Sequence, residues 1–155
     1  MGHPLLLFLL ILLILIAGAC RRKATGGEPA YAYVANGKSD TVTVIDLATM
    51  QPVRTLNVGK SPTGLAVNPK KPEVYAVNTD SGTVSVIDSH SNQVTGTIAV
   101  QRTPYSISVT SDGRWGYVAN SGSNTVSIIN MDNHRVAIDL YVGLASAPAI
   151  GRSLL

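Results

Sequence analysis

The sequence predicts an all-β protein made of β-propeller blades, four-stranded antiparallel sheets that form an incomplete ring of just under three blades. The first observation is a strand phrase around Tyr33 that recurs around Tyr75 and Tyr117, at a fixed step of 42 residues. The second is that each repeat divides into short β-branched runs separated by turns. A period of roughly 20 to 50 residues indicates a repeat architecture, and four strands in about 40 to 45 residues indicate a propeller blade.

The predicted strands follow the same scheme in each repeat. The first repeat has runs at 31–36, 41–46 and 53–58, without a leading strand. The second has runs at 64–68, 73–78, 83–88 and 94–100, and the third at 106–110, 115–120, 125–130 and 136–142. The turns between them are rich in Asn, Asp, Ser, Gly and Pro, which favours an up-and-down sheet. After residue 20 no window carries a helical period.

Adjacent apolar pairs interrupt the alternation expected of a half-buried strand. Ile45 follows Val44, and Ile87 follows Val86. A strand that is apolar at successive positions is buried on both faces. The sequence therefore predicts that both faces of a blade pack against neighbouring blades.

Repeated polar and aromatic residues mark the strand ends, and we expect structural roles for them. Asp46 and Asp88 follow a β-branched run and are predicted to bond the backbone of the next turn. The Asn residues that end the preceding run are predicted to do the same. The predicted structural set of the repeat consists of Tyr33, Asn36, Asp46, Tyr75, Asn78, Asp88, Tyr117, Asn120 and Asn130.

The N-terminal segment, residues 1–20, predicts a signal peptide. Residues 5–16 are an unbroken apolar run, and three small residues and Cys20 follow. As a helix, about 12 residues span about 18 Å, which is short against the ~30 Å hydrocarbon core of a bilayer. An apolar run that ends in small residues is typical of an export signal. Residues 21–29 predict a flexible tether, 30–143 the propeller repeats, and 144–155 an irregular tail.

The residues Ile16-Ala-Gly-Ala-Cys20 resemble the lipobox of bacterial lipoproteins. The resemblance implies cleavage before Cys20, lipidation of its thiol, and attachment to a membrane on the periplasmic or extracellular side. In the lipoproteins that this segment resembles, an Asp directly after the lipidated Cys is an inner-membrane retention signal. Arg21 occupies that position here, so the outer membrane is favoured as the location. A cleaved signal without lipid and an uncleaved apolar anchor are the alternatives.

The repeat phrasing resembles the YVTN family of β-propeller repeats over about residues 30–143. The phrases that carry the resemblance are Tyr117-Val-Ala-Asn120, Ser123-Asn-Thr-Val-Ser-Ile-Ile-Asn130, Val58-Gly-Lys-Ser-Pro62 and Ser111-Asp-Gly113. The resemblance implies a secreted or surface propeller, related to the propellers of cytochrome d1 and of some lactonases.

The repeats make fewer blades than a closed ring needs, since rings close at roughly 4 to 8 blades. Two interpretations stay open. Copies of the chain could assemble one ring as a homo-oligomer, in which the tail 144–155 of one copy supplies the missing leading strand of another. Alternatively, the chain is the truncated part of a longer propeller, which the poor match of the tail to a leading strand favours.

No residue pattern predicts catalysis, a metal or a cofactor. Cys20 is the only cysteine, which rules out a disulfide within the chain and any Cys-based metal or haem motif. A phosphate-binding glycine loop and a nucleophile elbow are both missing. His90 and His134 fall in turns before the last strand of their repeats, so we expect solvent-exposed histidines rather than ligands. Trp115 starts a strand and is predicted to be a surface or packing aromatic.

The function that this pattern favours is a non-enzymatic binding or scaffold module with a protein or polymer ligand. The formal net charge is +3, and apart from a cluster at residues 21–23 the Lys and Arg residues are scattered over loops, so we expect no nucleic-acid partner. The membrane is expected as a partner through the lipid or the apolar segment. The alternative function is the N-terminal part of a larger propeller enzyme, of a lactonase-like or cytochrome-d1-like kind.

Overall fold

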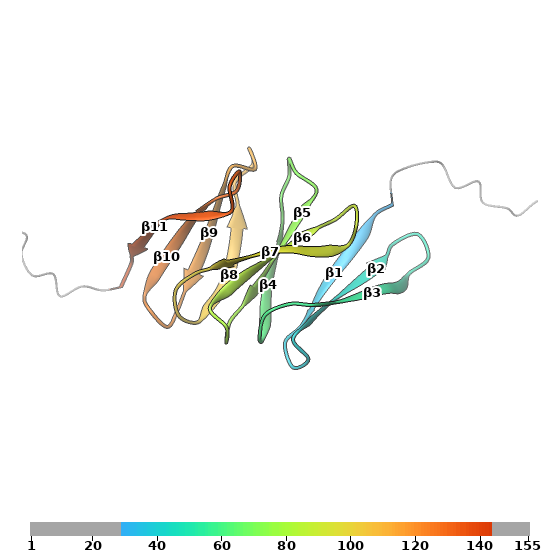
Figure 1. The fold of residues 1–155 in the computed structure, drawn as a ribbon, viewed down its shortest axis with the longest axis horizontal. Helices are drawn as coiled ribbons and strands as arrows, with labels where there is room; N and C mark the ends of the chain where they lie inside the picture. The colour runs from blue at the N-terminus through green and yellow to red at the C-terminus, as the bar shows by residue number, and fades with distance from the viewer. Residues whose placement is uncertain (1–28, 144–155) are drawn as a thin grey trace, which may run out of the picture.

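The computed structural model describes residues 29–143, which form three antiparallel sheets (Figure 1). The first sheet contains β1 (Tyr31–Asn36), β2 (Thr41–Asp46) and β3 (Gln51–Asn57). The second contains β4 (Pro62–Val67), β5 (Glu73–Asn78), β6 (Thr83–Asp88) and β7 (Gln93–Ala99). The third contains β8 (Pro104–Val109), β9 (Trp115–Asn120), β10 (Thr125–Asn130) and β11 (Arg135–Tyr141). Figure 1 shows the sheets side by side in chain order, and each sheet keeps its strands in chain order. The prediction of an all-β chain of repeated up-and-down sheets is confirmed.

The strand bounds differ from the predicted ones, and all three sheets contain bulges. Each last strand begins directly after the turn, at Gln51, Gln93 and Arg135, one or two residues before its predicted start. In the second sheet the register shifts between Val86 and Ile87, so the last strand holds one extra residue opposite them. A bulge absorbs that residue without ending the pairing, which sequence alternation alone does not reveal.

The middle sheet is buried on both faces. One face places Tyr75, Val77, Val84 and Val86 in a cluster with residues of the third sheet. The other face places Val74, Ala76 and Ile87 in a cluster with residues of the first sheet. The partners from the third sheet are Ile107, Val118, Ile129 and Met131, and those from the first sheet are Val42, Val44 and Leu56. Val86 and its neighbour Ile87 therefore pack in different core clusters, as the interrupted alternation predicted.

The two outer sheets each leave one face open within the described residues. Tyr117 is 42% exposed, although Tyr75, at the same position of the middle sheet, is fully buried. On the first sheet Val34 is 43% exposed, although its equivalent Ala76 is fully buried. These faces carry the residues that the repeat elsewhere buries between sheets.

The predictions for residues 1–20, for the lipidated Cys20, for most of the tether and for the tail 144–155 lie outside the described residues. Within residues 29–143 there is no helix long and apolar enough to span a bilayer.

Candidate functional site

The Asn residues at the strand ends hold two strands together. Each donates through Nδ2 to two hydroxyl groups of the next strand, at 2.8–3.2 Å. The pairs are Asn36 with Thr41 and Thr43, Asn78 with Thr83 and Ser85, and Asn120 with Thr125 and Ser127. The predicted bond from these side chains to the backbone of the next turn is wrong. The hydroxyls are closer because each Asn lies directly opposite the first Thr of the next strand.

The acidic residues at the ends of β2 and β6 bond the following turns. Asp46 Oδ1 accepts a hydrogen bond from the Ala48 amide at 2.7 Å. Asp88 Oδ1 accepts bonds from the Ser91 amide at 2.6 Å and from the Ser91 hydroxyl at 2.7 Å. These two bonds lower the pKa of the Asp88 carboxyl below its ordinary value. At the end of β10, Asn130 Oδ1 bonds its turn in the same way, through the amide of Asp132 at 2.8 Å.

The junction between the second and third sheets is filled by a polar network around Tyr75. The Tyr75 hydroxyl donates to Glu73 Oε2 at 2.5 Å and accepts a bond from Asn68 Nδ2 at 3.2 Å. Burial, and then the bond to Glu73, raise the pKa of Tyr75. His134 Nε2 lies 3.2 Å from the Glu73 carboxylate, and its ring meets Tyr75 edge-on at 6.4 Å between centroids. The prediction of a free, solvent-exposed turn histidine is wrong for His134, because the next sheet places a carboxylate beside it.

The same junction is closed at its edge by an ion pair and a buried thioether. Lys71 Nζ bonds Asp132 Oδ1 at 2.8 Å and the Met131 carbonyl oxygen at 2.6 Å. The Met131 side chain is fully buried and lies over Gly116, where an added Cβ would come 1.8 Å from the Met131 Cε. Glycine on β9 therefore makes the room that methionine fills.

The equivalent junction between the first and second sheets has different contacts. The Tyr33 hydroxyl donates to Asn92 Oδ1 at 2.5 Å, and Arg54 Nη1 donates to the Asn92 carbonyl at 3.3 Å. Asn92 stands one repeat before His134. Burial raises the pKa of Tyr33, and the nearby Tyr31 and Asp88 raise it further.

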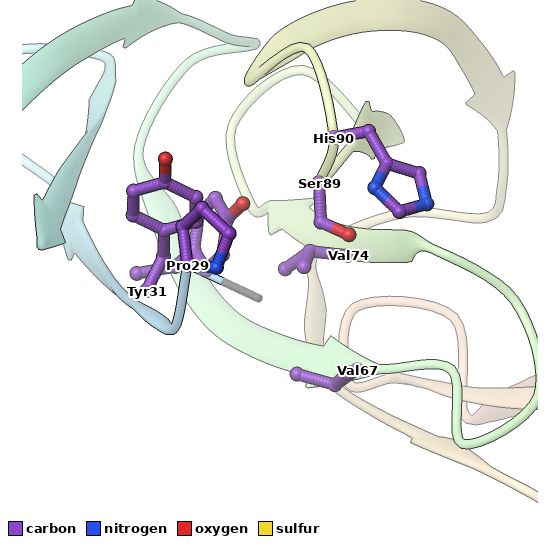
Figure 2. Close-up of a pocket in the computed structure, with 7 residues that line it drawn as sticks. Pro29, Tyr31, Val67, Val74, Ser89 and His90 are labelled. Atoms are coloured by element: carbon purple, nitrogen blue, oxygen red, sulfur yellow. The ribbon is translucent and has the colours of Figure 1, made fainter. Parts of the chain in front are cut away.

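Beside Tyr33 this junction opens into a pocket of about 310 Å³. Figure 2 shows Pro29 and Tyr31 on one side of it and Val74, Ser89 and His90 on the other. The complete lining is Pro29, Tyr31, Tyr33, Val67, Val74, Ser89 and His90. At this junction Ser89 stands where the next repeat has Met131, and Val74 stands where it has Gly116. Within the described residues, the first sheet also has no strand equivalent to β4.

The pocket brings together side chains of several chemical kinds. Its wall combines aromatic rings, valine methyl groups, a hydroxyl and an imidazole, the mixture common in small binding sites. Within residues 29–143 no group of three or more His, Cys, Asp or Glu side chains is arranged to hold a metal ion.

A family model of the YNCE-like β-propeller matches residues 17–150. The chain belongs to the YNCE-like β-propeller family. Together with the three sheets and their open outer faces, the match confirms the prediction of propeller blades in an incomplete ring.

Solved structures similar to this YNCE-like propeller agree on the fold. Hydrazine synthase of Kuenenia stuttgartiensis is 28% identical, with a TM-score of 0.69 over 72% of this chain and 32% of that one. The dihydro-heme d1 dehydrogenase NirN is 19% identical, with a TM-score of 0.65 over 71% of this chain and 24% of that one. Apo AztD from Citrobacter koseri is 16% identical, with a TM-score of 0.62 over 76% of this chain and 33% of that one. The chain spans a third or less of the length of these structures. No curated protein matches it.

Sequence reasoning on this YNCE-like propeller predicted no pocket, and it singled out Tyr33 only as a structural residue and His90 only as an exposed turn histidine. Tyr31, Val67, Val74 and Ser89 follow the strand and turn patterns and carry no motif. The signal that could have found the pocket is the difference between repeats, in which a glycine and a methionine are replaced by Val74 and Ser89.

Proposed function

We propose that this protein is a non-enzymatic binding module that is held at a membrane surface and presents a rigid array of sheets to a protein or polymer ligand. The pocket between the first and second sheets carries the proposal, because the repeat fills the same space at the next junction. A site that one repeat leaves open and the next closes is a candidate for contact with another molecule.

The groups around the pocket support binding rather than catalysis. The Tyr33 hydroxyl is engaged by Asn92, so the ring is fixed in place as a wall of the pocket. Tyrosine rings supply a large contact area at low cost in side-chain entropy. Val67 on β4 and Val74 on β5 add apolar surface to the wall of the pocket.

A crosslinking experiment tests the pocket as the binding surface. A photoreactive amino acid replaces Ser89, which lines the pocket, or Lys38, an exposed residue of the β1–β2 turn as the control. Both variants are expressed in full in a bacterial envelope and irradiated. We expect a crosslinked product from the Ser89 position alone. Equal labelling from both positions, or none from Ser89, would contradict binding at this pocket.

The proposed location is the periplasmic or cell-surface side of the outer membrane, with Cys20 as the lipidated first residue of the mature chain. The lipobox-like residues and the YVTN-type repeat phrasing support this location. Mass spectrometry of the membrane fraction tests it. We expect an N-terminal peptide that begins with a modified Cys20. An intact Met1 peptide or an unmodified Cys20 would contradict lipidation.

The second candidate is the N-terminal part of a larger propeller enzyme. The chain spans 32% and 24% of two structures whose names are those of enzymes, hydrazine synthase and dihydro-heme d1 dehydrogenase. Absorption spectra of the native protein and a lactone hydrolysis assay distinguish the candidates. A bound haem or quinone, or turnover of a lactone, would favour the enzyme and contradict the binding module.

A further inference from the structure

The turn between β1 and β2 shows how this fold holds a carboxylate. Asp40 closes that turn with a φ of 56°, and its Oδ1 accepts a hydrogen bond from the Ser61 amide at 2.8 Å. Ser61 lies in the loop that enters β4 and also has a φ of 56°. The amide before it, that of Lys60, donates to the Ser81 hydroxyl at 3.1 Å. Successive backbone amides in such a loop form a concavity that suits an anion, and here Asp40 supplies the anion.

One repeat later the loop keeps its conformation but the carboxylate is missing. Gly82 takes the place of Asp40 with a φ of 62°, and Thr103 takes the place of Ser61 with a φ of 51°. Within residues 29–143 the Thr103 amide makes no hydrogen bond. A Cβ on Gly82 would meet only backbone oxygens, at 3.6 and 3.8 Å, which is ordinary contact. The second copy therefore has room for the carboxylate that the first copy contains.

A second amide of the same loop is also available. Arg102 stands where the first copy has Lys60, and among the described residues its amide has no hydrogen-bond partner. The preceding residue accounts for this difference, because Gln101 replaces Gly59. A Cβ on Gly59 would lie 2.5 Å from the Ser81 hydroxyl oxygen, so a residue with a Cβ at this position keeps such a hydroxyl away.

An open pocket of about 600 Å³ lies beside these two amides. It is lined by residues 79–83 and 99–103, which are the second copies of the segments that meet at the Asp40 carboxylate. Arg102 adds a positive charge to the lining, and both Arg102 and Thr103 are exposed, so a ligand can reach them. Asp80 also lines the pocket, and its charge disfavours a second negative charge on the ligand. A singly charged carboxylate suits this lining better than a doubly charged phosphate.

We propose that this pocket binds a carboxylate group of a ligand, in the place that the Asp40 side chain occupies in the first copy. The Thr103 and Arg102 amides donate to its oxygens, and the Arg102 guanidinium balances its charge. Hydrogen bonds to an ionised acceptor are stronger than those between neutral groups.

The carboxylate pocket is separate from the pocket beside Tyr33. β6 begins at Thr83, which lines the carboxylate pocket, and ends at Asp88, directly before Ser89 of the other pocket. The two pockets therefore lie at opposite ends of the strands. This inference goes beyond the proposed function and does not depend on it, so its failure would leave the crosslinking result at Ser89 unchanged.

Nuclear magnetic resonance of the full chain in mild detergent, isotope-labelled at the serine and threonine nitrogens, tests the site. The probes are acetate, a blocked Ala-Asp-Ala peptide and its neutral Ala-Asn-Ala counterpart, at an ionic strength kept constant with sodium chloride. We expect the Thr103 amide signal to shift and saturate with both carboxylates and not with the neutral peptide. The Ser61 amide is the internal control and should not respond, because Asp40 already bonds it.

Two reciprocal variants exchange the copies. Gly82→Asp supplies the carboxylate from the chain itself, so the Thr103 amide should shift without a probe and lose its response. Asp40→Gly removes the carboxylate from the first copy, so the Ser61 amide should gain a response to acetate. Both positions accept these residues, since the repeat already places Asp and Gly at a positive φ there. An unchanged Ser61 signal in Gly82→Asp shows that this variant is folded.

A second pair of variants tests the charge. Arg102→Gln should weaken the response of Thr103 by about threefold, the size of an exposed ion pair. Lys60→Gln, the same change one repeat earlier, should leave it unchanged. A tighter response to the aspartate peptide than to acetate assigns the carboxylate to a side chain of a partner protein, and the reverse assigns it to a small molecule. A response to the neutral peptide equal to that of the aspartate peptide, or an undiminished response in Gly82→Asp, overturns the inference.

Discussion

A pair of side chains helps to decide whether the space between two sheets is filled or open. Met131 over Gly116 fills the space between the second and third sheets. Ser89 beside Val74 leaves the pocket between the first and second sheets. Within the described residues the first sheet also lacks a strand equivalent to β4, so the two junctions differ in side-chain volume and in backbone.

Gly64→Ala should destabilise the fold by about 1–3 kcal/mol, because its Cβ would press on the backbone of β8 at Tyr105 and Ser106. Urea unfolding of the variant measures the loss. Ser106→Ala is the matched control, since Ser106 is the same position one repeat later and is exposed. Equal midpoints for the two variants would show that β4 and β8 do not touch as closely as described.

The Asn residues at the strand ends differ in burial, and their substitution should differ in cost. Asn78 is fully buried and bonds Thr83 and Ser85, so Asn78→Ala leaves the buried Ser85 hydroxyl without a donor and should cost about 1–3 kcal/mol. Asn36 makes equivalent bonds but is only partly buried, and Asn36→Ala should cost less. Chemical denaturation compares the two, and a larger loss for Asn36→Ala would contradict this reasoning.

Asp88 should make stability depend on pH in the acid range. Hydrogen bonds from Ser91 lower the folded-state pKa of Asp88 below its ordinary value of 3.8. Its contribution is therefore fully present above the unfolded-state pKa and is lost as the pH falls through the folded-state pKa. Urea midpoints between about pH 5 and about pH 3 should fall less steeply in Asp88→Asn than in the unmodified chain. An equally steep fall in both proteins would contradict this contribution of Asp88.

The middle sheet is the most protected part of the described structure. β5 and β6 are buried almost throughout, whereas β3 and β11 are exposed at nearly every position. Local opening costs least where few apolar contacts must break. The centre of the array should therefore open last.

Hydrogen exchange followed by mass spectrometry checks this order. Peptides that cover β5 and β6 should exchange slowest, and those that cover β3 and β11 fastest. β7, also a last strand but in the middle sheet, is the internal control and should fall between them. Equal exchange rates in all three sheets would contradict the expected difference in local stability between the sheets.

The strands could be predicted because each is a short β-branched run between turn residues, and the 42-residue step fixed their order. The first residues of β3 and β7 could not be predicted, because the bulges opposite Val44 and Val86 insert a residue that leaves no mark in the alternation. The contacts of His134 could not be predicted either, and the only sequence signal of the pocket beside Tyr33 is the difference of Val74 and Ser89 from their equivalents in the next repeat. Both depend on which side chain the neighbouring sheet presents, Glu73 in one case and Val74 in the other.

Within residues 29–143 the array of sheets has two unlike outer faces, with Val34 exposed on the first sheet and Tyr117 on the third. The faces are complementary in the sense that the repeat packs such a pair together at each internal junction. An array of this kind can associate head to tail, and such contacts close a ring if the rotation allows it.

We therefore expect residues 24–155 to associate in solution as a discrete homo-oligomer. Light scattering of tag-free protein measures its mass. Tyr117→Lys should shift the population to monomer, since it places a charge on the open face, whereas Val94→Lys, on the last strand of the middle sheet, should not. A stable monomer of the unmodified segment would contradict association through these faces.

The separation of Val86 and Ile87 into different cores has a consequence for how the protein can change. Substitutions at well-separated sites that share no partners contribute nearly independently to stability, and the two clusters share no buried residue. A substitution that reshapes the space beside Tyr33 is then felt in one core and not in the other. The middle sheet thus separates the two core clusters. The junction between the first and second sheets can change in sequence towards a new ligand while the junction between the second and third sheets keeps those sheets packed together.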